Sequence, residues 1–206
     1  MKKLTSIFVL FMLCLAANAQ VVQYGIKAGI NWSGESDHEY PAYTFEGSGY
    51  TTGFAFGGVI NFQLSHSFDL EADLMYSMQG MKDDLTIMNE NGVSERTVDY
   101  KIRSHYMNIP IALKYFVMDG LYIECGPQVG YLLSKKDEAE NIDMTNSFDA
   151  SNTKKTDFSF FGGLGMVFKN KMFIDARYIQ GMTDTSKLYK GGRNRTFQIV
   201  LGYYFN

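Results

Sequence analysis

Apolar and polar residues alternate strictly along residues 22–33. The even positions from Val22 to Trp32 are apolar, and the odd positions from Gln23 to Ser33 are polar or glycine. Successive side chains of a β-strand point to opposite faces, so this period of two predicts a strand with one apolar and one polar face. Long strands with aromatic-rich apolar faces are typical of membrane β-barrels, in which one face meets hydrocarbon and the other a polar interior.

The same alternation recurs along the rest of the chain. The predicted strands cover residues 22–33, 52–64, 68–79, about 98–116, 121–133, 156–168, 172–182 and 195–205. The short connections between them are Ser65–Ser67, Val117–Gly120 and Lys169–Lys171, and the long ones are 34–51, about 80–97, 134–155 and 183–194. Outer-membrane barrels have short periplasmic turns, longer extracellular loops and an even number of strands. The sequence therefore predicts an all-β fold, an eight-stranded antiparallel up-and-down transmembrane β-barrel with both termini in the periplasm.

The fourth predicted strand contains two irregularities. Tyr100, Ile102 and Tyr106 lie in the phase opposite to the apolar face that begins at Met107. We expect either a bulge near residues 104–106 or a strand that rises above the bilayer at this point. Pro110 cannot donate a ladder hydrogen bond, so a bulge or a locally open ladder must accommodate it.

The first nineteen residues have the features of an export signal. Lys2 and Lys3 precede an apolar run over residues 7–15, and residues 17–19 read Ala-Asn-Ala, a small-residue cleavage pattern. We expect residues 1–19 to be removed, which leaves one barrel domain over residues 20–206. Cys125 is then the only cysteine, which excludes a disulfide framework and a cysteine-based metal site.

Charge and the placement of aromatic residues distinguish the membrane barrel from a nucleic-acid-binding protein and from a soluble barrel. The formal net charge is −3, and no basic run suggests nucleic-acid binding. A secreted lipocalin-like barrel would also alternate, with its apolar face turned inward around a ligand. Here one face of most strands is crowded with Phe and Tyr, and the other carries small and polar residues. This distribution favours the membrane barrel.

Several segments together resemble the PorT-like outer-membrane β-barrel proteins of the Bacteroidetes. The most specific is residues 106–115, YMNIPIALKY, and the opening YGIKAGIN at residues 24–31 is similar to the first strand of that family. Residues 162–165, 175–178 and 202–205 also match its pattern. The resemblance implies an eight-stranded barrel in a Gram-negative outer membrane, and it does not indicate a specific activity. Asn206 follows the last aromatic residue, which departs from the usual assembly signal.

Charged residues on the polar faces of the strands form the main group of candidate functional residues. They are Lys27, Asp69, Glu71, Asp73, Lys114, Glu124, Asp175 and Arg177. An eight-stranded interior is just wide enough for side chains to fill, and buried charges are costly unless they are paired. We expect a structural salt-bridge network in the lumen, in which Asp69 and Glu71 face Lys114 and Arg177, and Lys114 lies level with Glu124. A proton or ion path is the alternative.

Other candidate chemistry is weak. Ser104 and His105 lie near the predicted outer rim, where a lipid-modifying enzyme could place a nucleophile and a base, but no orienting group or oxyanion site accompanies them. His38 and His66 fall at opposite ends of the barrel and cannot share a metal. Acidic side chains in the third loop could bind calcium without an EF-hand pattern: Asp137, Glu138, Glu140 and Asp143. We expect no catalytic residue, metal or cofactor.

The first long loop carries aromatic residues among glycines and acids, namely Tyr40, Tyr43, Phe45 and Tyr50. Aromatic residues in loops on a rigid scaffold are typical of binding surfaces, although packing on the barrel rim would account for them equally well. The sequence therefore favours a non-enzymatic structural or surface-interaction protein. An accessory subunit of a secretion or uptake machine, a lipid A-modifying enzyme and a narrow pore remain as alternatives. Outer-membrane lipid and the barrel-assembly machinery are the expected partners.

Overall fold

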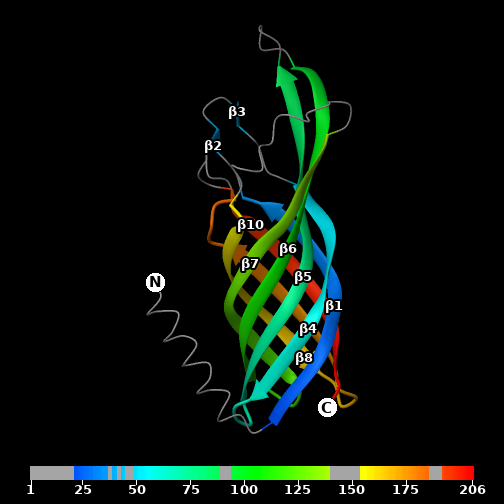
Figure 1. The fold of residues 1–206 in the computed structure, drawn as a ribbon, viewed down its shortest axis with the longest axis vertical. Coiled ribbons are helices and arrows are strands. Elements are labelled where there is room, and N and C mark those ends of the chain that lie inside the picture. Colours follow the sequence, from blue (N-terminus) through cyan, green and yellow to red (C-terminus); the bar gives the residue numbers. More distant parts are fainter. Residues whose placement is uncertain are drawn as a thin grey trace.

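The fold is a closed antiparallel β-barrel. The computed structural model describes residues 21–36, 39–40, 43–44, 49–88, 94–139, 154–185 and 192–206, so the predicted signal peptide and parts of the loops lie outside the described residues. The barrel strands are β1 (Val21–Glu35), β4 (Gly49–Gln63), β5 (Phe68–Met88), β6 (Ser94–Phe116), β7 (Leu121–Ala139), β8 (Thr156–Val167), β9 (Met172–Gly181) and β10 (Asn194–Tyr204). Each pairs with its neighbour in sequence, and β1 also pairs with β10 (Figure 1). The predicted eight-stranded barrel is confirmed.

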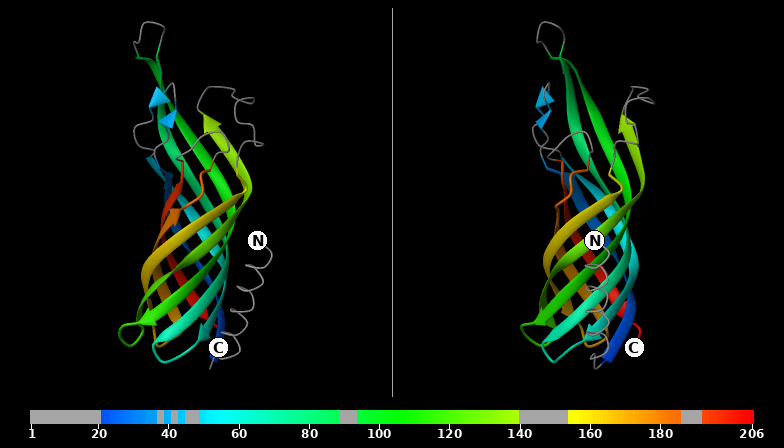
Figure 2. Two further views of the ribbon diagram at one scale, coloured as in Figure 1. Left: turned by 90° about the vertical axis from the view of Figure 1, so that its left-hand side faces the viewer. Right: turned by 60° about the vertical axis from the view of Figure 1, so that its left-hand side comes forward.

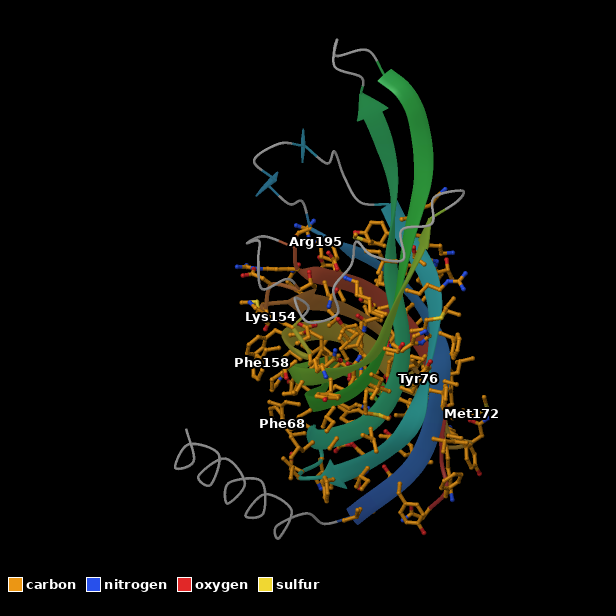
Figure 3. The ribbon with its side chains drawn as sticks, turned by 45° about the horizontal axis from the view of Figure 1, so that its top comes forward. Phe68, Tyr76, Lys154, Phe158, Met172 and Arg195 are labelled. Atoms are coloured by element: carbon orange, nitrogen blue, oxygen red, sulfur yellow. The ribbon has the colours of Figure 1, made fainter. Side chains whose placement is uncertain are left out.

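The polarity of the barrel is inverted relative to a soluble protein. On β1, the side chains of Lys27 and Asn31 are buried, whereas Ile26 and Ile30 are 56% and 43% exposed. Figure 3 shows side chains such as those of Phe158 and Met172 projecting from the outer wall. An apolar outer wall around a polar interior is stable where lipid replaces water outside. No helix in the described part of the chain is long and apolar enough to cross a membrane.

Short turns join the strands at one end of the barrel, and the long connections lie at the other end (Figures 1 and 2). At the turn end, Gly120 has a φ of 80°, which a residue with a side chain rarely adopts. A Cβ atom at Gly120 would also lie 2.4 Å from the carbonyl oxygen of Val167. The opposite, loop end carries a small two-stranded sheet of β2 (Glu39–Tyr40) and β3 (Tyr43–Thr44).

The second long connection is shorter than predicted because β5 and β6 continue as a ribbon above the barrel (Figure 2). We predicted a loop over about residues 80–97, but β5 runs to Met88 and β6 begins at Ser94. The third connection is shortened in the same way, because β7 reaches Ala139 instead of ending at residue 133. Both predictions were wrong because the apolar outer face ends at the membrane, whereas the backbone ladder continues beyond it.

The phase change predicted in the fourth strand reflects this rise above the membrane. Ile102 and Tyr106 point inward and are 1% and 5% exposed, in the same phase as the interior residues further down β6. The register between β6 and β7 shifts between His105 and Tyr106, so a bulge is also present. Ile102 is level with Met81, where the outer face meets water, so its apolar side chain lies on the inner side, whereas Tyr106 is level with Ser77 and belongs to the interior of the membrane-spanning barrel.

Pro110 is accommodated by an interruption of the ladder. The pairing of β5 with β6 stops at Ala72 and Ile111 and resumes at Met75 and Asn108 in unchanged register. Because proline has no N–H to donate, a locally open ladder costs less here than a distorted one. This is one of the two solutions that the sequence predicted.

The seam between β1 and β10 is extended by a side chain. Asn206 accepts a hydrogen bond from the backbone N–H of Tyr24 through Oδ1 at 3.1 Å. Its Nδ2 donates to the carbonyl of Val22 at 2.8 Å. The backbone N–H of Phe205 donates to the Tyr24 carbonyl at 2.8 Å. The carboxamide of Asn206 thus takes the place of a backbone peptide group and adds a rung to the seam.

Asn206→Asp should weaken this seam. The aspartate keeps the acceptor for Tyr24 but places a second acceptor against the Val22 carbonyl, so we expect a loss of about 1–2 kcal/mol in unfolding free energy. Urea titration followed by heat-dependent gel mobility measures this loss. Asn170→Asp is the matched control, because the Asn170 side chain acts as an acceptor for the backbone N–H of Met172 at 3.3 Å. An equal loss in both variants would contradict the assignment.

Candidate functional site

The barrel interior brings together the charged residues that the sequence singled out. Their exposed fractions are Lys27 3%, Asp69 3%, Glu71 1%, Asp73 4%, Lys114 1%, Glu124 3%, Asp175 0% and Arg177 2%. They come from β1, β5, β6, β7 and β9, and each is an inward position of its strand. Strands far apart in the sequence therefore meet through side chains in the lower half of the lumen.

Glu71 is the centre of this interior network. Its Oε1 accepts hydrogen bonds from Lys27 Nζ and Arg177 Nη2, both at 2.9 Å. Its Oε2 accepts from Lys114 Nζ at 2.5 Å and from the hydroxyl of Tyr204 at 2.8 Å. Four donors around one carboxylate replace the water that a buried charge has lost.

Arg177 links the other acids. Its Nε and Nη2 donate to the two carboxylate oxygens of Glu124 at 2.5 and 2.9 Å, and its Nη1 donates to Asp73 at 2.9 Å. Asp73 also forms an ion pair with Lys27 at 2.5 Å. A planar guanidinium suits this role because it presents several donors in fixed directions.

Three carboxylates gather closely enough to suggest a metal site. Oxygens of Glu71, Glu124 and Asp175 lie within 4.8 Å of one another. However, Nη2 of Arg177 lies 2.9 Å from Glu71 and 2.9 Å from Glu124, and 3.5 Å from Asp175. The guanidinium therefore occupies the position where an ion would be coordinated, and the cluster acts as an ion-pair network.

The detailed pairing differs from the prediction in two respects. Lys114 and Glu124 are register partners on β6 and β7, as expected, yet Lys114 makes its ion pair with Glu71, and Glu124 pairs with Arg177. Asp69 accepts a hydrogen bond from Asn61 Nδ2 at 2.8 Å, and no cation lies within ion-pair distance of it among the described residues. Long side chains reach past their register partners to a diagonal neighbour or to the second strand along, so backbone register does not determine which charges meet.

Aromatic residues complete the interior network, and the sequence analysis assigned them no role. The hydroxyl of Tyr122 donates to Asp175, and Lys114 Nζ lies 4.4 Å from the centre of the Tyr122 ring. Phe173 stacks on Tyr204 with ring centres 4.5 Å apart. The signal that could have revealed Tyr122 and Tyr204 is their inward phase, which places them among the polar residues of β7 and β10.

Above the charges lies a neutral polar layer. Asn31 Nδ2 donates to Ser77 Oγ at 2.9 Å, and Gln198 Nε2 donates to Asn31 Oδ1 at 2.9 Å. Below the charges, a hollow at the turn end is lined by residues that include Asp69, Lys114 and Tyr204. Lys114 and Tyr204 both contact Glu71, so the hollow ends at the interior network.

The rim pair considered for catalysis is separated by the strand. Ser104 faces the interior and is 8% exposed, whereas the adjacent His105 faces the outer wall. His105 Nδ1 shares a hydrogen bond of 2.6 Å with the hydroxyl of Tyr76, and the two rings stack. Ser104 and His105 therefore do not form a nucleophile–base pair. Cys125 is a free cysteine exposed on the outer wall.

Only part of the candidate loop surface falls in the described residues. Tyr50 is 60% exposed, and Tyr40 pairs with Tyr43 in the β2–β3 sheet at the backbone level. Phe45 lies outside the described residues. The acidic third loop is likewise only partly covered: the backbones of Asp137 and Glu138 belong to β7, whereas Glu140 and Asp143 lie outside.

Comparison with known proteins agrees with this architecture. Residues 18–187 match the family described as outer membrane protein beta-barrel domain. The chain belongs to this family. It is accordingly a bacterial outer-membrane β-barrel protein.

Solved structures of other barrels are similar at low sequence identity. Neisserial surface protein A (NspA) is 10% identical with a TM-score of 0.54, over 90% of this chain and 100% of that chain. Ail, the attachment invasion locus protein of Yersinia pestis, in complex with the heparin analogue sucrose octasulfate, is 14% identical with a TM-score of 0.45, over 89% and 99%. The likeness to NspA shows the fold. Among curated proteins, none matches the chain significantly in sequence.

The interior network predicts unequal effects for two neighbouring acids of this family member. Glu71→Gln removes the carboxylate that pairs with buried Lys114, so we expect a loss of about 3–5 kcal/mol in unfolding free energy. Asp69→Asn is the matched control, because an amide oxygen still accepts the bond from Asn61, and its loss should stay below about 1 kcal/mol. Urea unfolding in detergent micelles measures both, and similar losses would refute the central role of Glu71.

Proposed function

We propose that the protein is a non-enzymatic, non-conducting outer-membrane barrel that acts through the loops it presents at the cell surface. The observation that carries this proposal is the interior network around Glu71 and Arg177, whose ion pairs and hydrogen bonds join side chains of several strands within the lumen. A barrel that is closed in this way offers its partners the ends and the outer wall. The loop end has the larger surface, because β5 and β6 continue beyond the other strands.

We infer that the loop end faces the exterior, with the turns and both termini in the periplasm. The support is the asymmetry of the connections, since barrels of this kind have short periplasmic turns and long extracellular loops. The narrower membership in the PorT-like branch of the Bacteroidetes rests on the segment Tyr106–Tyr115. Cleavage of residues 1–19 as a signal peptide rests on their composition.

A second candidate is an accessory subunit of a secretion or uptake machine. The pairing of β4 with β5 ends at Gly49 and Lys82, and that of β6 with β7 ends at Tyr100 and Ala139. Residues 83–88 and 94–99 therefore form a two-stranded ribbon with no further strand paired to either edge among the described residues. Open edges of this kind accept an additional strand from a partner protein. Co-purification from native membranes would test this candidate.

The orientation can be tested with single cysteines in a Cys125→Ala background. A cysteine at the exposed Lys155, at the loop end, should react with a membrane-impermeant maleimide on intact cells. A cysteine at the exposed His66, at the turn end, should react only after the outer membrane is permeabilised. The reverse labelling pattern would invert the proposed topology.

The closed lumen predicts the absence of stable channel activity. Purified protein in a planar bilayer should show no persistent conductance steps, because the side chains that cross-link the lumen leave little room for a hydrated ion. The Glu71→Gln variant, refolded in parallel, should show brief openings if the network is the seal. Large persistent steps in the unmodified protein would refute a plugged interior.

Loop shortening tests where the protein binds. Replacing residues 37–48 or 140–152 by a short Gly-Ser link should leave the barrel folded, since the free energy of loop closure depends only weakly on loop length. An unchanged heat-dependent gel shift checks folding. Surface partners captured by the native protein from its own membrane should be lost in at least one shortened variant. Full retention by both would move the binding surface to the ribbon, the turns or the outer wall.

A further inference from the structure

The buried charges of the barrel do not balance. Among the described residues, three cations and five carboxylates have buried side chains. The cations are Lys27, Lys114 and Arg177, and the carboxylates are Asp69, Glu71, Asp73, Glu124 and Asp175. The interior therefore carries a formal excess of two negative charges. A buried charge without compensation is costly, so an additional positive group would stabilise this interior.

Asp69 is the carboxylate at which this excess is least compensated. Each of the other four has a nitrogen of a lysine or arginine within 3.5 Å. Lys114 is the register partner of Asp69, but its Nζ is directed to Glu71 at 2.5 Å. The hydrogen-bond partner of Asp69 in the described part of the chain is a neutral donor, Nδ2 of Asn61 at 2.8 Å. Asp69 is thus a buried acid whose nearest cation is already paired with another carboxylate.

A second acceptor beside Asp69 has no donor. Asn61 is 2% exposed, and its Nδ2 donates both to Asp69 and, at 3.3 Å, to Oε1 of Gln23. These two acceptors fix the orientation of the amide, because the oxygen of Asn61 could not replace the nitrogen there. Oδ1 of Asn61 is buried and receives no hydrogen bond from the described residues. Buried polar atoms without a partner are rare, so this oxygen indicates a missing donor.

Both side chains line the hollow at the turn end of the barrel. The hollow has a volume of about 290 Å³, at the lower end of the range for ligand pockets. Its walls include the apolar side chains of Phe116, Val167 and Phe168. Asp119 and Lys169 also line it, and both are exposed, so the hollow opens to solvent between the turns and these two charges offset each other. A small ligand can therefore reach Asp69 from the turn end.

We propose that this hollow binds an organic ammonium ion, a primary amine on a short alkyl stem. An ammonium group carries one positive charge and three donors, which suit the carboxylate of Asp69 and Oδ1 of Asn61. The apolar walls suit the alkyl stem. A metal ion fits less well, because Asp69 belongs to no group of three acidic, histidine or cysteine ligands among the described residues. The site lies opposite the loop surfaces of the proposed function, so each proposal can fail without the other.

The test uses isotope-labelled protein purified from outer membranes in a nonionic detergent, and the NMR signal of the Asn61 side-chain amide reports binding in the hollow. Putrescine represents a free amine, acetyl-lysine methylamide represents the lysine side chain of another protein, and butanol is the neutral probe. The test variant is Asp69→Asn. The matched control is Asp157→Asn at the loop end, because Asp157 likewise accepts a hydrogen bond from an asparagine amide, Nδ2 of Asn194 at 3.1 Å.

At least one of the two amines should shift the Asn61 signal until it saturates, and butanol should not. Asp69→Asn should weaken amine binding by about tenfold or more, the loss expected for one charge-assisted hydrogen bond. Asp157→Asn should bind as the unmodified protein does. Tighter binding of putrescine would assign the site to a free amine, and tighter binding of the lysine derivative would assign it to a side chain of another protein.

A second readout needs no variant. The unmodified protein should unfold at a higher urea concentration in the presence of the amine that binds than in butanol, because a ligand of the folded state stabilises it. The absence of a saturable shift with both amines would overturn the proposal. A loss of affinity in Asp157→Asn but not in Asp69→Asn would do the same, as would displacement of both amines by an equal concentration of Mg²⁺.

Discussion

The whole structure depends on the need of every backbone N–H and C=O group within the hydrocarbon to find a partner in the protein. Lipid offers no hydrogen bonds, and an unpaired group there costs several kcal/mol. A sheet meets this condition only when it closes, which is why the pairing of β1 with β10 matters as much as any interior contact. The carboxamide of Asn206 extends that pairing by one rung, where the backbone of β10 has ended.

Closure creates an interior that side chains must fill. Polar residues face inward because the apolar ones are used on the outer wall, and the charged members can be buried only when they neutralise one another. Glu71 and Arg177 meet this requirement with multiple contacts each, across strands that are neighbours in neither sequence nor sheet. The result is an interior network of ion pairs, with tyrosine hydroxyls beside it and a neutral polar layer above it.

The end of the membrane is visible as a change in the pattern of β5 and β6. Within the lipid, apolar residues point outward; above it, Ile102 points inward while Lys82 and Arg103 follow the outward phase. The backbone hydrogen bonds between β5 and β6 do not depend on this change and continue into the ribbon. The strands β5 and β6 therefore run without a break from the membrane-spanning barrel through its rim into the ribbon.

The sequence by itself determined the strand number, the order and phase of the strands, the end that carries the turns, and the set of charges that enters the lumen. These follow from a period of two, which is local to each strand and is read without knowing the neighbours. The ladder gap at Pro110 and the irregularity near Tyr106 were also predictable, because a missing N–H and a change of phase are local signals.

Only the tertiary structure decided which charges meet and how far the strands extend. Lys114 and Glu124 are level on neighbouring strands, yet Lys114 pairs diagonally with Glu71 on β5, and Glu124 pairs with Arg177 on β9, two strands away, since long side chains follow the most favourable charge arrangement in three dimensions. The extension of β5 and β6 was missed because hydropathy reports the solvent outside a strand, whereas strand length is determined by backbone pairing with its neighbour.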